Sequence, residues 1–303
     1  MPTDEVARSL VTRDGTRLAY WLRPARLRPP ARPRRALVLL HGMASNHTRW
    51  SEFCAFTRLG ENWDLLRLDL RGHGDSLVRS RTGMPVWCND LAEILAREAI
   101  GQALLVGHCL GANLALHFAH QNPTLVGGLV LIEPMLPQAR SGALAWASRL
   151  RPLLRAVVPG LLGLAALGLH RRRLAALDLV ALDREARQAL AATGEFPEAR
   201  FASSCEDLKS LPLVIYLQDL IAVTGPLPEL ATIAAPTLVL LAGGSRFGAL
   251  EAARHALAAM PRATIQFLAA KHWIPTEQPE ALRLAIEDWC KPLESAWESA
   301  AQA

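Results

Sequence analysis

A cysteine stands at the centre of the sequence Gly107-His108-Cys109-Leu110-Gly111. The apolar run at residues 103–106 predicts a strand before it, and residues 112–119 predict a helix after it. The flanking glycines permit a tight strand-to-helix turn that lifts the Cys109 side chain clear of a sheet. Enzymes that transfer acyl groups carry a nucleophile at the apex of such a turn. The thiol of Cys109 is therefore the first candidate catalytic group.

A thiol nucleophile restricts the acyl compounds that can react. Thiolate attack on an ester gives a tetrahedral intermediate with two possible leaving groups. A thiol ionises with a pKa of about 8.5, well below that of a simple alcohol, so the intermediate tends to expel the thiolate and regenerate the ester. Thioesters and activated enol or aryl esters avoid this problem because both leaving groups are then good. An apolar pocket around Cys109 would favour transfer of the acyl group over hydrolysis, because it excludes water.

Apolar runs alternate with helical segments along most of the chain. They predict a hairpin at residues 8–12 and 16–22, strands at 36–40, 63–68, 103–106, 128–133, 236–241 and 264–268, and helices at 86–99, 112–119, 249–259 and 279–293. Continuous apolar strands separated by helices predict an α/β protein with a mostly parallel sheet covered on both faces.

Polar residues follow several of these strands. His41, Asp69, Cys109 and His272 each come just after a predicted strand, and Glu133 ends one. The carboxyl ends of parallel strands meet at one edge of the sheet, and sites on such sheets lie there. The sequence therefore predicts a single active site that contains these side chains.

Residues 134–233 interrupt the alternation. They are helical in pattern and rich in leucine and alanine, which predicts a helical cap inserted into a core of residues 1–133 and 234–303. The aromatic residues of this cap are expected to pack in its interior: Trp146, Phe196, Phe201 and Tyr216. Residues 152–169 are nearly long enough to span a bilayer. Arg155, Pro159 and three glycines interrupt this run, so we expect broken cap helices over an apolar pocket.

The charge of the chain is uneven. The formal net charge is +5, and residues 134–177 contain seven arginines and no acidic residue. Such a field would attract an anionic substrate, an acidic carrier protein or a lipid surface. Nucleic acid is not an expected partner, because no binding motif accompanies the charge. Five cysteines without metal-ligand spacing, and a start that lacks a basic head and an apolar run, predict a cytoplasmic protein with no metal or cofactor.

Four motifs occur in a characteristic order: His41-Gly42, the hexapeptide at residues 71–76 (Arg-Gly-His-Gly-Asp-Ser), the turn at 107–111 and a late His272. With these motifs the chain resembles the α/β-hydrolase superfamily. The resemblance implies the α/β-hydrolase fold, with a mostly parallel central sheet, helices on both faces and an inserted helical cap. It also implies Cys109 as nucleophile and His272 as general base. The backbone N–H groups of Met43 and Leu110 would form the oxyanion hole.

The acidic residue that would orient the general base does not stand at its usual position in this sequence. Members of the superfamily usually carry an aspartate shortly after the strand predicted at 236–241, but residues 242–248 contain no carboxylate. Some haloalkane dehalogenases take this acid from the end of the strand that follows the elbow helix, and Glu133 stands there. We expect Glu133 to orient His272. Glu251 and a Cys–His dyad without an acid are the alternatives, the dyad because a thiol ionises more readily than a hydroxyl.

These residues predict hydrolysis of a hydrophobic or activated carboxylic ester or thioester through an acyl-enzyme with a Cys-His-Glu triad. One alternative is an acyltransferase that takes an acyl or aminoacyl group from a CoA or carrier-protein thioester. Another is a binding protein that keeps the fold without catalysis. The expected partner is a hydrophobic acyl substrate, with membrane-surface contact through the basic cap as a further alternative. The sequence leaves open whether Cys109 replaces a serine.

Overall fold

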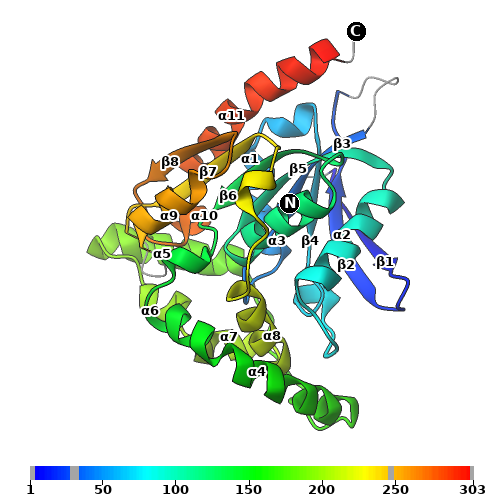
Figure 1. Cartoon of the computed structure of the whole chain (residues 1–303), viewed down its shortest axis with the longest axis vertical. Coiled ribbons are helices and arrows are strands. Elements are labelled where there is room, and N and C mark those ends of the chain that lie inside the picture. The colour runs from blue at the N-terminus through cyan, green and yellow to red at the C-terminus, as the bar shows by residue number, and fades with distance from the viewer. Residues whose placement is uncertain (1–3, 28–33, 245–248, 301–303) are drawn as a thin grey trace.

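A central β-sheet organises the molecule (Figure 1). The computed structural model describes residues 4–27, 34–244 and 249–300. Within them, eight strands pair in the order β1-β2-β4-β3-β5-β6-β7-β8. The strands are β1 (Val6–Val11), β2 (Arg17–Arg23), β3 (Arg34–Leu40), β4 (Asp64–Leu68), β5 (Ile100–His108), β6 (Val126–Ile132), β7 (Thr237–Ala242) and β8 (Ala263–Leu268). The β1–β2 and β2–β4 pairs are antiparallel, and the other neighbours are parallel.

Both faces of the sheet are covered because its central strands are apolar on both sides. In β3, Val38 and Leu40 pack on one face, while Leu37 and Leu39 pack on the other. The first face is covered by α2 (Met84–Arg97), α3 (Leu110–Gln121) and α9 (Leu250–Leu257). The second is covered by α1 (Ser51–Phe56), α10 (Ile274–Glu277) and α11 (Pro279–Ala300). The predicted α/β fold with helices on both faces is therefore confirmed, although single elements begin and end a few residues away from the prediction.

Five helices lie between β6 and β7, and we call residues 134–233 the cap. They are α4 (Gly142–Ala166), α5 (Leu179–Thr193), α6 (Glu198–Phe201), α7 (Ser204–Ser210) and α8 (Leu213–Val223). The cap occupies the lower part of Figure 1, where α4 packs along α8. Two buried ion pairs join it to the core. Arg49 contacts Asp183 of α5 at 2.7 Å, and His73 contacts Asp219 of α8 at 2.9 Å.

Two expectations for the cap were wrong. The run at residues 152–169 was expected to form broken helices, but α4 continues through Pro152 and Pro159 to Ala166. Each proline removes one helical hydrogen bond, but both lie on the exposed side of the helix, where water can satisfy the freed carbonyls. Trp146 is not an interior residue, since 64% of it is exposed. Among the helices of the described residues, none has the length and apolar character needed to cross a bilayer.

Candidate active site

Cys109 lies at a strained turn between β5 and α3. Its φ angle is 54°, in the left-handed region that side chains rarely adopt. Its N–H donates to the carbonyl of Ile132 on the neighbouring strand β6, at 2.9 Å. The glycines of the motif permit the close packing that holds the turn. A Cβ on Gly107 would lie 2.3 Å from the carbonyl oxygen of Gly111, and a Cβ on Gly111 would lie 2.3 Å from that of Leu40.

The carboxylate of Glu133 is held by two hydrogen bonds. Its Oε1 accepts the N–H of Ala242 at 2.8 Å, and its Oε2 lies 2.9 Å from Nδ1 of His272. An ionised carboxylate only accepts hydrogen bonds, so Nδ1 of His272 donates and carries a proton. Glu133 directly follows β6 and is itself strained, with φ at 49°. The hydrogen bond to Glu133 therefore fixes how the His272 ring is turned.

His272 also hydrogen-bonds the thiol of Cys109. Burial lowers the pKa of the His272 imidazole, but the hydrogen bonds to Cys109 and Glu133 and their negative charges outweigh burial and raise it to about 10. Its ring packs edge-on against Trp273, with centroids 5.4 Å apart. His272 therefore contacts both the Cys109 thiol and the Glu133 carboxylate, so a proton can pass between the thiol and the imidazole.

The two expected oxyanion donors lie beside Cys109. Leu110 is the first residue of α3, so its N–H has no acceptor within the helix and points out of the positive helix end. Met43 lines the same cavity as Cys109. His41 holds the Met43 loop, because its ring bonds the carbonyl of Gly42 at 2.8 Å and accepts the N–H of Leu70 at 3.0 Å. Burial is the main reason that the pKa of His41 falls to about 3, which keeps the ring neutral.

Other candidates from the sequence take structural positions. Glu251 is exposed and bonds Arg254 at 3.1 Å, away from His272. His108 bonds the backbone oxygen of His272 at 3.1 Å and is buried, which lowers its pKa well below the usual range. In the 71–76 hexapeptide, Arg71 pairs with Asp90 at 2.5 Å. Asp69 accepts the N–H of Asp75 at 2.7 Å. Residues 245–248, part of the loop without a carboxylate, lie outside the described residues.

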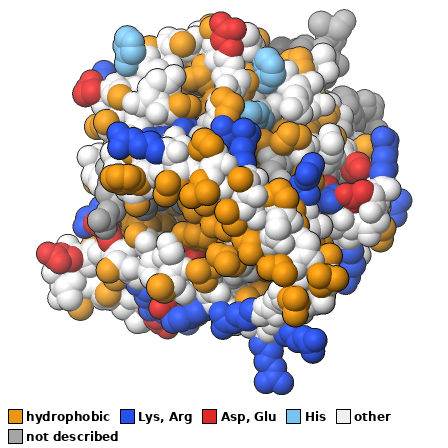
Figure 2. All heavy atoms as spheres, turned by 60° about the horizontal axis from the view of Figure 1, so that its bottom comes forward, with side chains coloured by type: hydrophobic (Ala, Val, Ile, Leu, Met, Phe, Trp, Pro, Cys, Tyr) orange, Lys and Arg blue, Asp and Glu red, His pale blue; other side chains and the backbone are white. Residues whose placement is uncertain are grey.

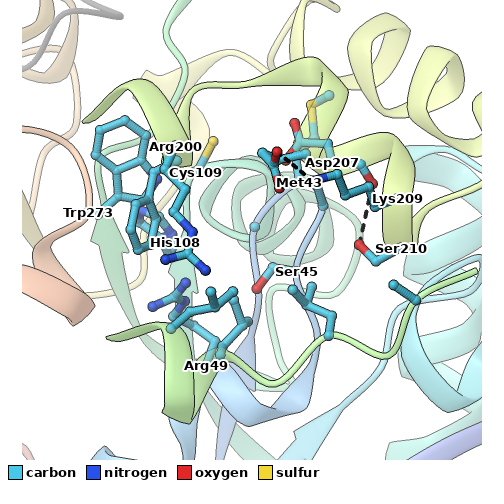
Figure 3. A pocket seen from close by; sticks show the side chains of 18 of the residues that line it. Met43, Ser45, Arg49, His108, Cys109, Arg200, Asp207, Lys209, Ser210 and Trp273 are labelled. Carbon is cyan, nitrogen blue, oxygen red and sulfur yellow. Dashed lines mark hydrogen bonds and ion pairs between the residues drawn. The ribbon is translucent and has the colours of Figure 1, made fainter. Parts of the chain in front are cut away.

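A cavity of about 240 Å³ opens above Cys109 (Figure 3). Its walls come from the core and from the cap, and the cap part includes residues 175–177 and much of α7. The prediction of an apolar pocket is only partly correct. Met43, Leu177 and Phe201 line it together with charged residues: Arg49, Arg200, Glu206, Asp207 and Lys209. Among the described residues, no three His, Cys, Asp or Glu side chains gather to hold a metal ion.

The sequence did not reveal two polar groups of this cavity. Arg49 is buried between Asp183 and Thr276, which it contacts at 2.7 and 2.6 Å. The pKa of Asp207 is raised to about 7, mainly by burial and also by the nearby charges of Asp219 and Glu206. No motif surrounds either residue, and their positions depend on how the cap folds onto the core, so the sequence offered no signal for them.

Comparison with known proteins agrees with this architecture. A sequence profile described as "Alpha/beta hydrolase family" matches residues 37–284. An uncharacterised protein of Mycobacterium tuberculosis is 34% identical over 99 residues, which are 32% of this chain, and the match spans only 28% of that protein's length. The sn-1-specific diacylglycerol lipase ABHD11 of Danio rerio is 25% identical over 249 residues, covering 80% of this chain and 74% of the lipase.

A solved structure shows the same fold. The crystal structure of a hydrolase from Pseudomonas aeruginosa PA01 superposes with a TM-score of 0.66 at 22% identity. The superposition covers 94% of this chain and 98% of the hydrolase. The profile match extends from within β3 into α11 and includes Cys109, Glu133 and His272. The chain belongs to the alpha/beta hydrolase family.

Proposed function

We propose that this protein hydrolyses a carboxylic ester or thioester through an acyl-enzyme on Cys109. The observation that carries the proposal is the continuous hydrogen-bonded chain from Cys109 through His272 to Glu133. A nucleophile, a base and a group that orients the base are the parts that covalent acyl transfer requires. The strained turn at Cys109 and the open cavity above it provide access for the substrate.

The reaction begins when His272 takes the proton of the Cys109 thiol and the resulting thiolate attacks the substrate carbonyl carbon, which forms a C–S bond. The N–H groups of Leu110 and Met43 stabilise the resulting oxyanion. Acylation removes the negative sulfur that helps to raise the pKa of His272, so the imidazolium then gives its Nε2 proton to the departing alkoxide or thiolate. Neutral His272 next takes a proton from water, whose oxygen attacks the thioester. Collapse releases the carboxylic acid, and His272 returns its proton to the Cys109 thiolate.

The cavity and the curated relative both favour an acyl substrate with apolar parts. Leu177, Leu182 and Phe201 offer apolar contacts above Cys109. The zebrafish relative is named a lipase that acts on diacylglycerol, a hydrophobic ester. The thiol favours thioesters or activated esters over simple alkyl esters, because a thiolate leaves more readily than an alkoxide. We therefore propose hydrophobic thioesters and aryl or enol esters as the substrate class.

Intact-protein mass spectrometry tests the proposal. The purified chain is incubated with a panel of acyl thioesters and aryl esters, and the released free acid is measured in parallel. We expect the mass of one acyl group on Cys109, followed by release of free acid with turnover. Cys109→Ala is the control that must stay unlabelled. If no donor labels Cys109 and no acid is released, the protein is a binding relative and the proposal is wrong.

Transfer to a second acceptor is an alternative outcome, and one observation favours it. Phe196, Phe201 and Trp273 pack against one another beside His272, with centroids 5.0 to 5.6 Å apart. Only 4% of His272 is exposed, so water has limited access to the base. In the same assay, a stable acyl-enzyme that discharges only when an amine, alcohol or thiol acceptor is added would identify an acyltransferase.

A further inference from the structure

A stripe of exposed apolar side chains runs along the outside of α4. We call it the α4 stripe: Trp146, Leu150, Leu153, Val157, Leu164 and Leu167. These side chains are between 43% and 77% exposed. Their spacing of three, four or seven residues puts them on one helical face. From Trp146 to Leu167 the stripe is about 32 Å long at the rise of an α-helix. Exposed apolar surface of this extent marks a contact surface.

Arginines surround the α4 stripe, and we call them the arginine rim: Arg149, Arg155, Arg171, Arg172 and Arg173, all exposed. Arg149 lies over the ring of Trp146, 5.5 Å from its centroid. Arg79 of the core extends the positive region, because its guanidinium bonds the carbonyl of Arg171 at 3.1 Å. No acidic residue occurs from residue 134 to 177. Figure 2 shows apolar side chains across this side of the molecule, with Lys and Arg along its lower edge.

We propose that the α4 stripe and the arginine rim bind the surface of an anionic lipid bilayer. An interfacial helix inserts an apolar face between lipid headgroups while its basic residues meet anionic phosphates. Trp146 at one end of the stripe is a residue type favoured at the lipid–water boundary. A second copy of the chain fits the surface less well, because a symmetric dimer would bring two arginine rims together.

The same surface adjoins the active site. Arg171 bonds the carbonyl of Leu208 at 3.0 Å, and the N–H of Ala175 bonds that of Lys209 at 2.8 Å. The chain that leaves α4 is thereby tied to α7, and both segments line the cavity above Cys109. Binding at the α4 stripe would hold this cavity wall close to the bilayer, where apolar acyl compounds partition.

Sedimentation with lipid vesicles tests the proposal on the full chain without substrate, so its outcome is independent of the proposed hydrolysis. One set of vesicles is phosphatidylcholine alone, and the other contains about one third phosphatidylglycerol. We expect at least tenfold stronger binding to the anionic vesicles, decreasing as salt is added because salt screens the arginines. Equal binding to both vesicles, or none to either, would overturn the proposal.

Matched variants locate the binding surface. R171Q/R172Q/R173Q should weaken binding to anionic vesicles roughly a hundredfold. The control R13Q/R17Q/R262Q removes three exposed arginines elsewhere and should change binding several-fold at most. L153Q/L164Q should weaken binding about tenfold or more, because the inserted apolar area falls. Its control is V11Q/F56Q, at residues that are 64% and 67% exposed on the core.

Thermal unfolding confirms that each variant folds, since these side chains are exposed. If variants and controls lose binding equally, general charge or hydrophobicity is responsible and the assignment is wrong. Light scattering tests the remaining alternative, in which a second copy of the chain covers the α4 stripe. A wild-type dimer that L153Q/L164Q converts to a monomer, without vesicle binding by either form, would identify the α4 stripe as a self-association surface instead.

Discussion

Oε2 of Glu133 lies 2.9 Å from Nδ1 of His272, although 139 residues separate them in the chain. Both side chains are buried, at 5% and 4% exposure. The N–H of Ala242 holds the other carboxylate oxygen. Because the backbone of β7 holds the carboxylate, the carboxylate in turn holds the ring of His272 in one orientation.

Glu133→Gln should lower the rate of acyl-enzyme turnover by about two orders of magnitude or more. The amide keeps the shape of the side chain but removes the charge that stabilises the His272 imidazolium. The rate at which iodoacetamide alkylates Cys109 should fall less than the turnover rate, because a thiol can ionise without help from a base. The control is Glu251→Gln, at an exposed residue paired with Arg254, which should retain wild-type turnover. A Glu133→Gln variant within a few-fold of wild type would indicate a Cys–His dyad.

Cys109→Ala should abolish acyl-enzyme formation without unfolding the protein, because the side chain is only partly buried and lines the cavity. Loss of a covalent nucleophile costs several orders of magnitude, so retention of more than about a tenth of the wild-type rate would remove Cys109 from the mechanism. Mass spectrometry and a thermal unfolding curve check the two parts of this prediction.

Cys109→Ser should shift the preference from thioesters toward oxygen esters. The serine alkoxide is as poor a leaving group as the alkoxide of the substrate, so the tetrahedral intermediate no longer returns preferentially to the ester. His272 and Glu133 must activate the hydroxyl, which ionises less readily than a thiol. The measurement is the ratio of kcat/KM for a matched ester and thioester pair. An unchanged ratio would contradict the leaving-group explanation.

The stability of the protein should depend on pH through His272. Its pKa in the folded protein, about 10, lies above the ordinary value of 6.5. Its protonated form therefore contributes stability that is complete below about pH 6.5 and is lost as the pH rises through about 10. Urea unfolding measures the free energy of unfolding of wild type and of His272→Gln. The difference between the two should decrease as the pH rises across this range. A difference that stays constant from about pH 6 to pH 10 would show that the His272 imidazole is not strongly raised in pKa.

Gly111→Ala should destabilise the protein by about 3 kcal/mol or more. The added Cβ would lie 2.3 Å from the carbonyl oxygen of Leu40, which is backbone and cannot move aside freely. Gly160→Ala is the matched control, because a Cβ there meets nothing within 4 Å and the residue lies in α4. It should stabilise the helix by roughly 0.5–1 kcal/mol. Urea unfolding measures both, and equal effects would mean that the turn at Cys109 tolerates a wider separation from β3.

The sequence alone determined the elements around Cys109 and the fold that contains them. Apolar runs such as residues 103–106 indicate a strand that is buried on both faces of a sheet. The glycines two residues before and two residues after Cys109 indicate close backbone packing. These are local properties of the chain, so they can be seen without knowing its path. The convergence of Cys109, Glu133 and His272 also followed, because parallel strands end at a common edge.

Only the tertiary structure decided which carboxylate meets His272. Glu133 and Glu251 both lie in segments that follow strands, but in the folded chain Glu133 bonds His272 while Glu251 pairs with Arg254 at the surface. The cap shows the same limit. Trp146 and Leu153 fit the helical pattern of a buried face, but burial requires another element to pack against them, and α8 covers the opposite side of α4. Periodicity shows that a helix has an apolar face, whereas the packing of the whole chain determines what, if anything, covers it.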